Sequence, residues 1–274
     1  MNNGFLRVGV ANPEIKVADP DYNAEKIIGI AKAAAKAHVE LLVFPELCLT
    51  GSTCGDLFYQ KALTDGAQDA LRKILDATRT FATALFVGLP VRHAGKLYNA
   101  CAVLQSGVIL GVTPKRRLPE NDACNGLRHF ASDADAFGSV FLCGAYSPFG
   151  QMLFRCGEAD VGVEIGEDLW ASVPPSSVSG ALVTVNLSAS GETVGEADKR
   201  RTLVKSQSLR TLSAYVYAGA GRGESTTDAV FSGHGMIAEK GYILAENAPF
   251  ADNELTVADI DTAYLLFERA RNNT

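Results

Sequence analysis

The chain has 274 residues, a formal net charge of −6 and a hydrophobic content of 47%. Its length allows one large domain or two small ones with a sizeable core. No apolar run approaches the roughly 20 residues of a membrane span, and the first residues lack the basic and apolar regions of a secretory signal. An acidic balance without a long basic cluster argues against nucleic acid as the main partner. We therefore expect a soluble, cytoplasmic protein that binds neither membranes nor nucleic acid.

The six cysteines are too sparse for a disulfide framework in a chain of this length. Cys48, Cys101 and Cys143 lie in or beside apolar runs, so we expect them to be reduced core residues. No two cysteines have the CxxC spacing, and the four histidines are far apart in the sequence. We therefore expect no metal site and no cofactor.

The first half of the chain alternates predicted strands with amphipathic helices. The strands are expected at residues 5–10, 41–44, 84–89, 97–105 and 108–112. One helix aligns Ala24, Ile27, Ile28, Ala31, Ala34, Ala35 and His38 on one face, with Asp21 or Asn23 as its N-cap. A second aligns Ala67, Ala70, Leu71, Ile74, Leu75 and Thr78. Ser106 and Gly107 predict a tight hairpin turn.

The second half begins with a polar loop that runs from Lys115 to about Phe130. Further strands are expected at residues 151–154, 161–165, 182–185, 214–218, 229–237 and 242–245, with a helix at 198–212. This order indicates a mixed sheet covered by helices. No linker or change of composition divides the chain, so we predict a single domain over residues 1–274.

The run from Val161 to Ile165 stops abruptly at Gly166, Glu167 and Asp168. This pattern is typical of a buried strand that ends in a sharp elbow, where an enzyme can present a nucleophile. Gly166, at the apex, has no side chain that could attack a substrate.

Two further polar residues follow predicted strands, namely Glu46 and Lys115. A carboxylate, an ammonium group and a nucleophile at converging strand ends would suit amide hydrolysis. The carboxylate takes the proton of the nucleophile, and the lysine stabilises the developing oxyanion. Taken alone, the two residues are equally well explained as solvated charges at sheet edges.

The stretches 44–51 (FPELCLTG) and 53–58 (TCGDLF) resemble the first motif of the nitrilase (carbon–nitrogen hydrolase) superfamily. More narrowly, they are similar to the N-terminal glutaminase domain of glutamine-dependent NAD synthetases. The similarity continues at residues 114–115, 163–170, 174–176, 186–190, 206–208, 215–217, 223–228, 258–261 and 269–271. It therefore covers nearly the whole chain.

This resemblance implies a nitrilase-like four-layer αββα sandwich that assembles into oligomers. It also implies hydrolysis of glutamine through a cysteine thioester, with ammonia passed to an ATP-dependent synthetase domain. Carried over to this chain, it makes Glu46 the general base, Lys115 the oxyanion stabiliser and the backbone N–H of Glu167 a second oxyanion donor. The substrate-binding positions that it implies are Ser52, Asn121, Gly126, Glu167, Trp170, Ser190 and Glu196.

The chain departs from the family mainly in the glutamine pocket. Gly166 stands where the family has its cysteine, and Ser52 and Asn121 each replace a tyrosine. Ala123 and Gly126 replace two glutamates, and Glu196 replaces a basic residue. Cys124 lies in a loop with no strand elbow behind it, so we interpret it as an incidental thiol rather than a replacement nucleophile.

Two functions remain open. The chain is either an amidase-type domain that is inactive as written, or a non-catalytic scaffold that keeps the nitrilase fold. No glycine-rich ATP pyrophosphatase motif appears, so we expect the synthetase domain to be absent. The expected partners are glutamine or a related small amide, a synthetase domain or chain, and a second copy of this chain. The apolar segment 262–271 would contribute to that homo-oligomer, fold back on its own domain, or fray because its synthetase partner is missing.

Overall fold

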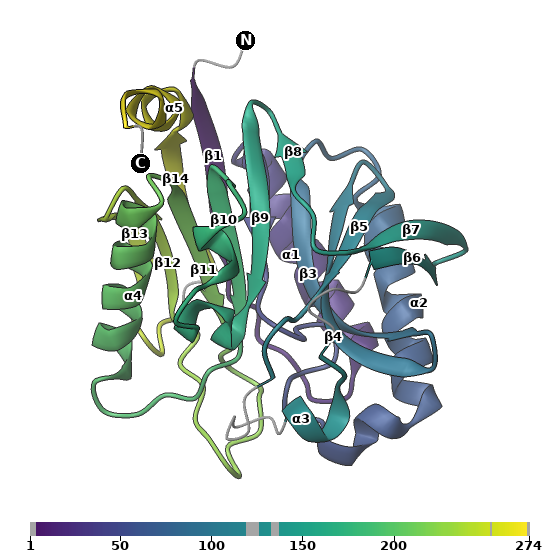
Figure 1. Cartoon of the computed structure of the whole chain (residues 1–274). Coiled ribbons are helices and arrows are strands. Elements are labelled where there is room, and N and C mark those ends of the chain that lie inside the picture. Colours follow the sequence, from purple (N-terminus) through teal and green to yellow (C-terminus); the bar gives the residue numbers. More distant parts are fainter. Residues whose placement is uncertain (1–3, 119–125, 133–136, 253, 273–274) are drawn as a thin grey trace.

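The apolar runs of the chain form two β-sheets that pack face to face, with helices on their outer faces (Figure 1). The computed structural model describes residues 4–118, 126–132, 137–252 and 254–272. The first sheet has eight strands in the order β14 (Leu255–Asp261), β1 (Phe5–Ala11), β2 (Leu41–Val43), β3 (Ala84–His93), β4 (Lys96–Gln105), β5 (Val108–Pro114), β7 (Ala145–Gly150) and β6 (Phe137–Leu142). The second has six, in the order β13 (Tyr242–Asn247), β12 (Gly235–Glu239), β11 (Ala214–Gly219), β10 (Val183–Ser188), β9 (Ala159–Ile165) and β8 (Phe154–Cys156).

Helices complete a four-layer αββα sandwich, as the resemblance predicted. They are α1 (Pro20–Lys36), α2 (Lys61–Ala77), α3 (Gly126–His129), α4 (Glu196–Arg210) and α5 (Thr262–Arg271). Short 3-10 helices cover Gly55–Tyr59, Gly166–Trp170 and Pro175–Ser177. None of the described helices has both the length and the apolar character needed to cross a membrane.

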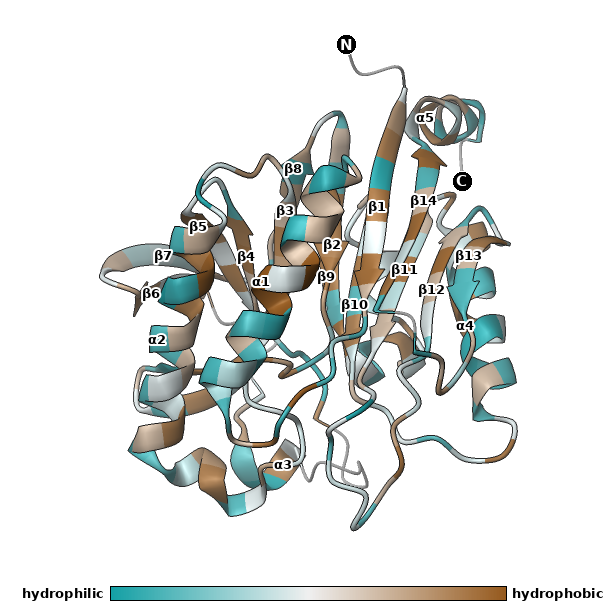
Figure 2. Cartoon of the chain, turned by 180° about the vertical axis from the view of Figure 1, so that it is seen from behind, coloured by the Kyte–Doolittle hydropathy of each residue, from teal (hydrophilic) through white to brown (hydrophobic). Residues whose placement is uncertain are grey.

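Three apolar layers hold the sandwich together. Residues such as Ile27 of α1 and Leu71 of α2 pack on the outer face of the eight-stranded sheet. A second layer, which includes Val8 and Val163, lies between the sheets, and Val204 of α4 packs on the outer face of the six-stranded sheet. Figure 2 shows mainly hydrophobic strands and helices whose outward surfaces are hydrophilic. Burial of these faces is the main favourable term for folding.

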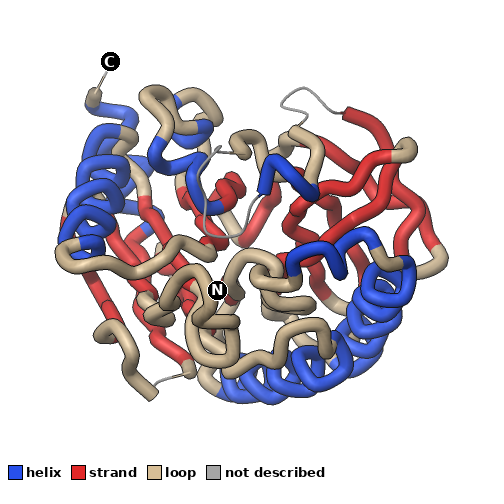
Figure 3. The backbone as a smooth tube through the Cα atoms, turned by 90° about the horizontal axis from the view of Figure 1, so that it is seen from below, coloured by secondary structure: helices blue, strands red, loops and turns tan. Residues whose placement is uncertain are grey.

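The strand directions bring several loops to one end of the sandwich. β1, β2 and β3 are parallel, as are β9, β10 and β11. The β3–β4–β5 meander is antiparallel throughout, so β5 runs in the same direction as β3. The carboxyl ends of β2, β5, β9 and β10 therefore open into the loops and short helical turns that Figure 3 shows between the two sheets.

Some predicted boundaries were wrong for local reasons. Asp19, rather than Asp21 or Asn23, caps α1, because Pro20 fixes the first helical position. His38 lies beyond the end of α1, at a φ of +58°. The strand expected at residues 229–237 begins only at Gly235, and the one expected at 151–154 is β8 at 154–156. The predicted Ser106–Gly107 hairpin is confirmed, since both residues have positive φ between β4 and β5.

The sequence did not indicate three of the strands, namely β6, β7 and β14. The segment 262–271 folds back as α5, and Leu265 is buried in the layer between the sheets. Cys48 and Cys101 are buried free thiols as predicted, and Cys143 is a partly buried one.

Candidate active site

The structure brings together the three strand ends that the sequence singled out. Glu46 follows β2, Lys115 follows β5, and Gly166 follows β9. The side chains of Glu46 and Lys115 are almost completely buried. The site thus lies between the two sheets, where the first contributes Glu46 and Lys115 and the second contributes the elbow with Glu167.

Lys115 lies between two carboxylates. Its Nζ donates a hydrogen bond of 2.6 Å to Oε1 of Glu46 and one of 2.8 Å to Oε2 of Glu167. The Nδ2 of Asn99 donates to the same Oε1 of Glu46 at 2.6 Å. Oε2 of Glu46 accepts the backbone N–H of Ala189, from the end of β10, at 3.1 Å. Glu46 therefore joins the two sheets through charged and neutral donors.

Burial and charge set the protonation of this group. Burial raises the pKa of Glu46 to about 7, although the neighbouring ammonium of Lys115 opposes the rise. Burial alone would lower the pKa of Lys115, but the charges of Glu46 and Glu167 outweigh it and raise that pKa above its ordinary value. Burial likewise opposes ionisation of Glu167, but the cation of Lys115 prevails and lowers the pKa of Glu167. Lys115 and Glu167 are therefore charged at neutral pH, and Glu46 titrates near the pH at which a general base works best.

Gly166 forms the elbow at the end of β9. Its φ is +53°, a left-handed conformation that glycine adopts without strain. A Cβ added here would lie 2.6 Å from Oε2 of Glu46 and 2.9 Å from Nζ of Lys115. The ion pair thus occupies the space in which a side chain at position 166 would begin.

Two buried polar side chains hold the elbow in place. Asp168 accepts the backbone N–H of Ile165 at 3.0 Å and that of Arg117 at 2.9 Å, which ties the elbow to the segment after Lys115. Burial raises the pKa of Asp168 to about 6. Asn186 of β10 donates to the carbonyl of Gly166 at 3.2 Å.

Ser52 lies in the loop that follows Glu46 and is completely buried. Its hydroxyl donates to the backbone carbonyl of Glu46 at 2.9 Å. Its backbone N–H donates to Glu224 at 2.7 Å, and the same carboxylate accepts the hydroxyl of Thr53 at 2.6 Å. The side chain predicted to bind substrate is thus used within the protein, where it fixes the loop that carries Glu46.

Of the other predicted substrate-binding residues, some contact the Glu46–Lys115–Glu167 group and others do not. Ser190 contacts Glu167, with 3.4 Å between its Oγ and Oε1. Trp170 is partly exposed and lines a surface hollow of about 440 Å³ together with Arg116, Arg117, Leu118, Ser132, Glu167 and Ala171. Glu196 begins α4 and pairs with Lys199 at 3.1 Å. Gly126 begins α3, whereas Asn121 lies outside the described residues, as does Cys124.

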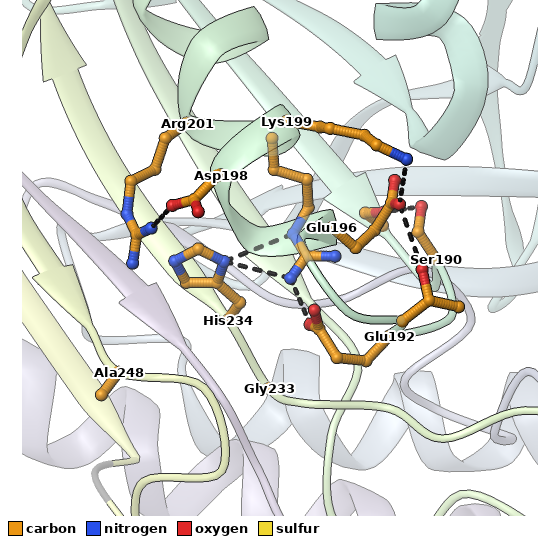
Figure 4. A network of polar contacts seen from close by, with 12 residues as sticks. Ser190, Glu192, Glu196, Asp198, Lys199, Arg201, Gly233, His234 and Ala248 are labelled. Atoms are coloured by element: carbon orange, nitrogen blue, oxygen red, sulfur yellow. Dashed lines mark hydrogen bonds and ion pairs between the residues drawn. The ribbon is translucent and has the colours of Figure 1, made fainter.

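A buried polar network supports the loop that carries Ala189 and Ser190 (Figure 4). Arg200 of α4 donates to Glu192 and, at 3.3 and 3.2 Å, to Nδ1 of His234. An arginine can only donate, so Nδ1 of His234 accepts and its Nε2 carries the proton that Glu246 accepts at 2.5 Å. Burial lowers the pKa of His234, which keeps this neutral form at neutral pH.

Sequence reasoning missed these supporting residues. The signal for Asn99 and Asn186 was a polar residue inside an otherwise apolar strand. Asp168 was noted only as part of the elbow, and nothing in the sequence pointed to Arg200. In the part of the chain that the structure describes, no group of three or more His, Cys, Asp and Glu side chains is placed to hold a metal ion.

Comparison with known proteins assigns the fold and the family. The family model described as carbon-nitrogen hydrolase matches residues 7–266. The chain belongs to the carbon–nitrogen hydrolase family. It is 38% identical to the glutamine-dependent NAD(+) synthetase of Mycobacterium leprae over 281 residues, and 39% identical to that of Mycobacterium tuberculosis over 280 residues. These alignments cover 100% and 99% of this chain but 41% of each relative, so the chain spans less than half the length of these curated relatives.

Solved structures agree with the fold. The glutamine-dependent NAD(+) synthetase of Cytophaga hutchinsonii superposes with a TM-score of 0.85 at 28% identity, over 94% of this chain and 43% of that one. An amidase from Nesterenkonia sp. AN1 superposes with a TM-score of 0.76 at 18% identity, over 97% of both chains. The second match concerns the fold alone.

Proposed function

We propose that this carbon–nitrogen hydrolase chain is a glutaminase-type domain of a glutamine-dependent NAD synthetase that cannot complete amide hydrolysis. The likeness to NAD synthetases across almost the whole chain supports the type of domain. The observation that carries the loss of activity is Gly166, which lies at the apex of the elbow with the Glu46–Lys115 pair closed over it. Glutamine or a related small amide is the proposed ligand, and a synthetase domain or chain is the proposed partner.

The remaining groups fit the chemistry that the family implies. With a thiol at position 166, Glu46 would accept its proton as sulfur attacks the amide carbonyl, and Lys115 would stabilise the negative oxygen that forms. The backbone N–H of Glu167 would be the second donor to that oxygen. Glycine supplies no atom that can form the thioester, so the covalent route is closed while its supporting groups remain.

A second candidate is a non-catalytic scaffold domain, and the closed ion pair favours it. Lys115 donates to both Glu46 and Glu167, so its charge is compensated without a ligand. The buried free thiols suit the reducing cytoplasm that we propose as its setting.

The test is ammonia release from glutamine. We expect the chain to release no ammonia above a buffer blank, since loss of a covalent nucleophile typically lowers kcat by roughly a millionfold. The control is Glu46→Ala. Ammonia release that this substitution abolishes would show that the site works without a residue-166 nucleophile, and the proposal would be wrong. Calorimetric titration with glutamine separates the two candidates, because a scaffold without a pocket gives no heat of binding.

A further inference from the structure

The β6–β7 hairpin extends the eight-stranded sheet beyond the six-stranded one. Figures 1 and 2 both show it projecting past β8, the edge strand of the smaller sheet. Three aromatic side chains of the hairpin lie in solvent, with Phe137, Tyr146 and Phe141 exposed by 86%, 75% and 57%. An uncovered aromatic surface of this kind is unusual for a monomer.

The three aromatic residues lie on one face of the hairpin. Strand residues alternate between faces, and Val140, Leu142 and Phe149 are buried on the helix-covered side. Phe137, Phe141 and Tyr146 therefore lie on the opposite side, which would face a second sheet if that sheet reached so far. Phe141 pairs with Tyr146 across the hairpin, and their ring centroids are 5.2 Å apart.

The outer edge of β6 lacks the protection that edge strands usually have. Charged side chains and prolines normally prevent such strands from pairing with other chains. Each of the other three edge strands carries charge, for example Asp259 in β14, Glu246 in β13 and Arg155 in β8. β6 reads FGSVFL and has neither charge nor proline. Within the described ranges, only β7 pairs with it.

We propose that β6 pairs with β6 of a second copy of this chain, antiparallel about a two-fold axis at Ser139. Directly opposite residues in antiparallel strands point to the same face, so only registers that keep odd positions opposite odd ones are compatible with the buried side. The register centred on Ser139 places Phe137 of each copy opposite Phe141 of the other. Tyr146 and Phe141 of one copy and Phe137 of the second would then lie side by side on one face of the joined sheet.

The strand is therefore self-complementary. In this register Gly138 lies opposite Val140 of the second copy, and the two Ser139 hydroxyls meet at the axis. Cross-strand aromatic pairs contribute about 0.2–1 kcal/mol each beyond the backbone hydrogen bonds. The pairing would join two eight-stranded sheets into one continuous sheet and remove an exposed edge from each.

The size of the contact predicts a weak dimer. An aromatic side chain buries roughly 150–250 Å² when fully covered, and each copy offers three that would be only partly covered. The total falls below the roughly 1,200 Å² of a stable interface. We therefore expect a dissociation constant on the order of tens of micromolar. This proposal does not depend on the proposed function, because β6 contributes nothing to the site.

Sedimentation velocity of the whole chain, from about 1 to about 300 μM, tests it. We expect the 29.0 kDa monomer to convert progressively to a species of twice that mass. Phe137→Glu should weaken the association at least tenfold without altering the fold, because this side chain is almost fully exposed. The matched control is Tyr242→Glu on β13, an exposed aromatic residue outside the hairpin, which should leave the association unchanged.

A charge pair tests the register. Phe137→Lys alone should weaken the dimer, and the double variant Phe137→Lys/Phe141→Glu should restore it, because each introduced ammonium then faces an introduced carboxylate of the other copy. A single 29.0 kDa species at every concentration would overturn the proposal. So would a dimer that resists Phe137→Glu, or one that Tyr242→Glu dissociates instead. Failure of the double variant to restore association would overturn the register.

Discussion

Two effects oppose a side chain at position 166, namely the strain of its backbone conformation and the contact with the Glu46–Lys115 ion pair. A comparison with Gly55 separates the two effects. Gly55 has the same φ of +53°, but nothing lies within 4 Å of the Cβ that could be added to it. A side chain at either position adopts a left-handed conformation, at about 1–2 kcal/mol. Only a side chain at position 166 must also displace Glu46 and Lys115.

We therefore expect Gly166→Cys to lower the free energy of unfolding more than Gly55→Cys does, as measured by urea denaturation. We also expect the new thiol not to restore normal turnover of glutamine, because groups of the family pocket are missing at positions 121 and 126. A substrate misplaced by about 1 Å typically loses on the order of a hundredfold in rate. Turnover equal to that of an active relative, or equal destabilisation by the two substitutions, would contradict this account.

Glu46 should make stability depend on pH. Its pKa is about 7 in the folded chain and about 4.5 when exposed, so between these values the folded state holds more protons than the unfolded one. Stability contributed by the protonated form is therefore lost as the pH rises through this range, by an amount on the order of 3 kcal/mol. Glu46→Gln cannot ionise. Relative to this variant, the wild type should become less stable between about pH 5 and pH 8 in chemical denaturation. An unchanged difference between the two proteins would show that Glu46 does not titrate there.

The sequence predicted the polar residues of the site better than it predicted their supports. Glu46, Lys115 and the elbow were recognisable because each ends an apolar run. Asn99 and the N–H of Ala189 could not be assigned to Glu46, because both contacts join segments more than 50 residues apart. Ser52 was expected in the pocket, but its contact with the Glu46 carbonyl depends on a turn that spacing does not reveal.

At the scale of elements, Arg269 is one of the side chains that hold α5 on the sandwich. Arg269 donates to the carbonyls of Gly180, Ala181, Thr211 and Leu212, which lie at the start of β10 and after α4. Arg271, two residues on, is exposed and pairs only with Glu268 and the ring of Phe267 among the described residues. The two arginines thus give a matched pair for substitution.

We expect Arg269→Ala to remove the Arg269 donors from these carbonyls, three of which lie in partly buried contacts, and to loosen α5 from the sandwich. The loss should be about 1–3 kcal/mol, with faster amide hydrogen exchange over residues 262–271. Arg271→Ala should change the free energy of unfolding by no more than about 0.5 kcal/mol. It should leave amide hydrogen exchange over residues 262–271 unchanged. If both substitutions had the same effect, helix propensity rather than the Arg269 contacts would hold α5.

The sequence predicted the strands that are formed by long apolar runs. It did not predict strands in which one face carries polar or exposed side chains, or in which Gly or Pro interrupts the run. β14 reads LTVADID, and its two aspartates are typical of a loop. It is a strand because it pairs with β1, with Phe5 opposite Asp261 at the other end of the chain. β6 and β7 are interrupted by Gly138 and Pro148 and place aromatic residues in solvent. Single-sequence periodicity does not contain such long-range pairing.

For the whole molecule, the resemblance to the nitrilase superfamily predicted the architecture, which the hydrophobic periodicity of the sequence did not. Alternating strands and helices indicated a mixed sheet, but only the family motifs implied two sheets and four layers. The structure also shows that segment 262–271 packs on its own domain, since Leu265 of α5 is buried in the layer between the sheets. The oligomer that the family implies through its helical faces stays a prediction, and Leu266 and Phe267 are the exposed apolar residues of α5 that it would use.

The closure of Lys115 between Glu46 and Glu167 also has a consequence for how such chains change over generations. Once the residue at position 166 is glycine, losing Lys115 would leave the carboxylates of Glu46 and Glu167 buried without their cation. Losing Glu46 would remove the acceptor of the buried Asn99 amide. Purifying selection can then retain both residues for folding alone, long after the reaction is gone. Genome surveys that count this glutamate and lysine as marks of an active hydrolase would therefore overestimate the number of working enzymes, and the residue at the elbow is the better diagnostic.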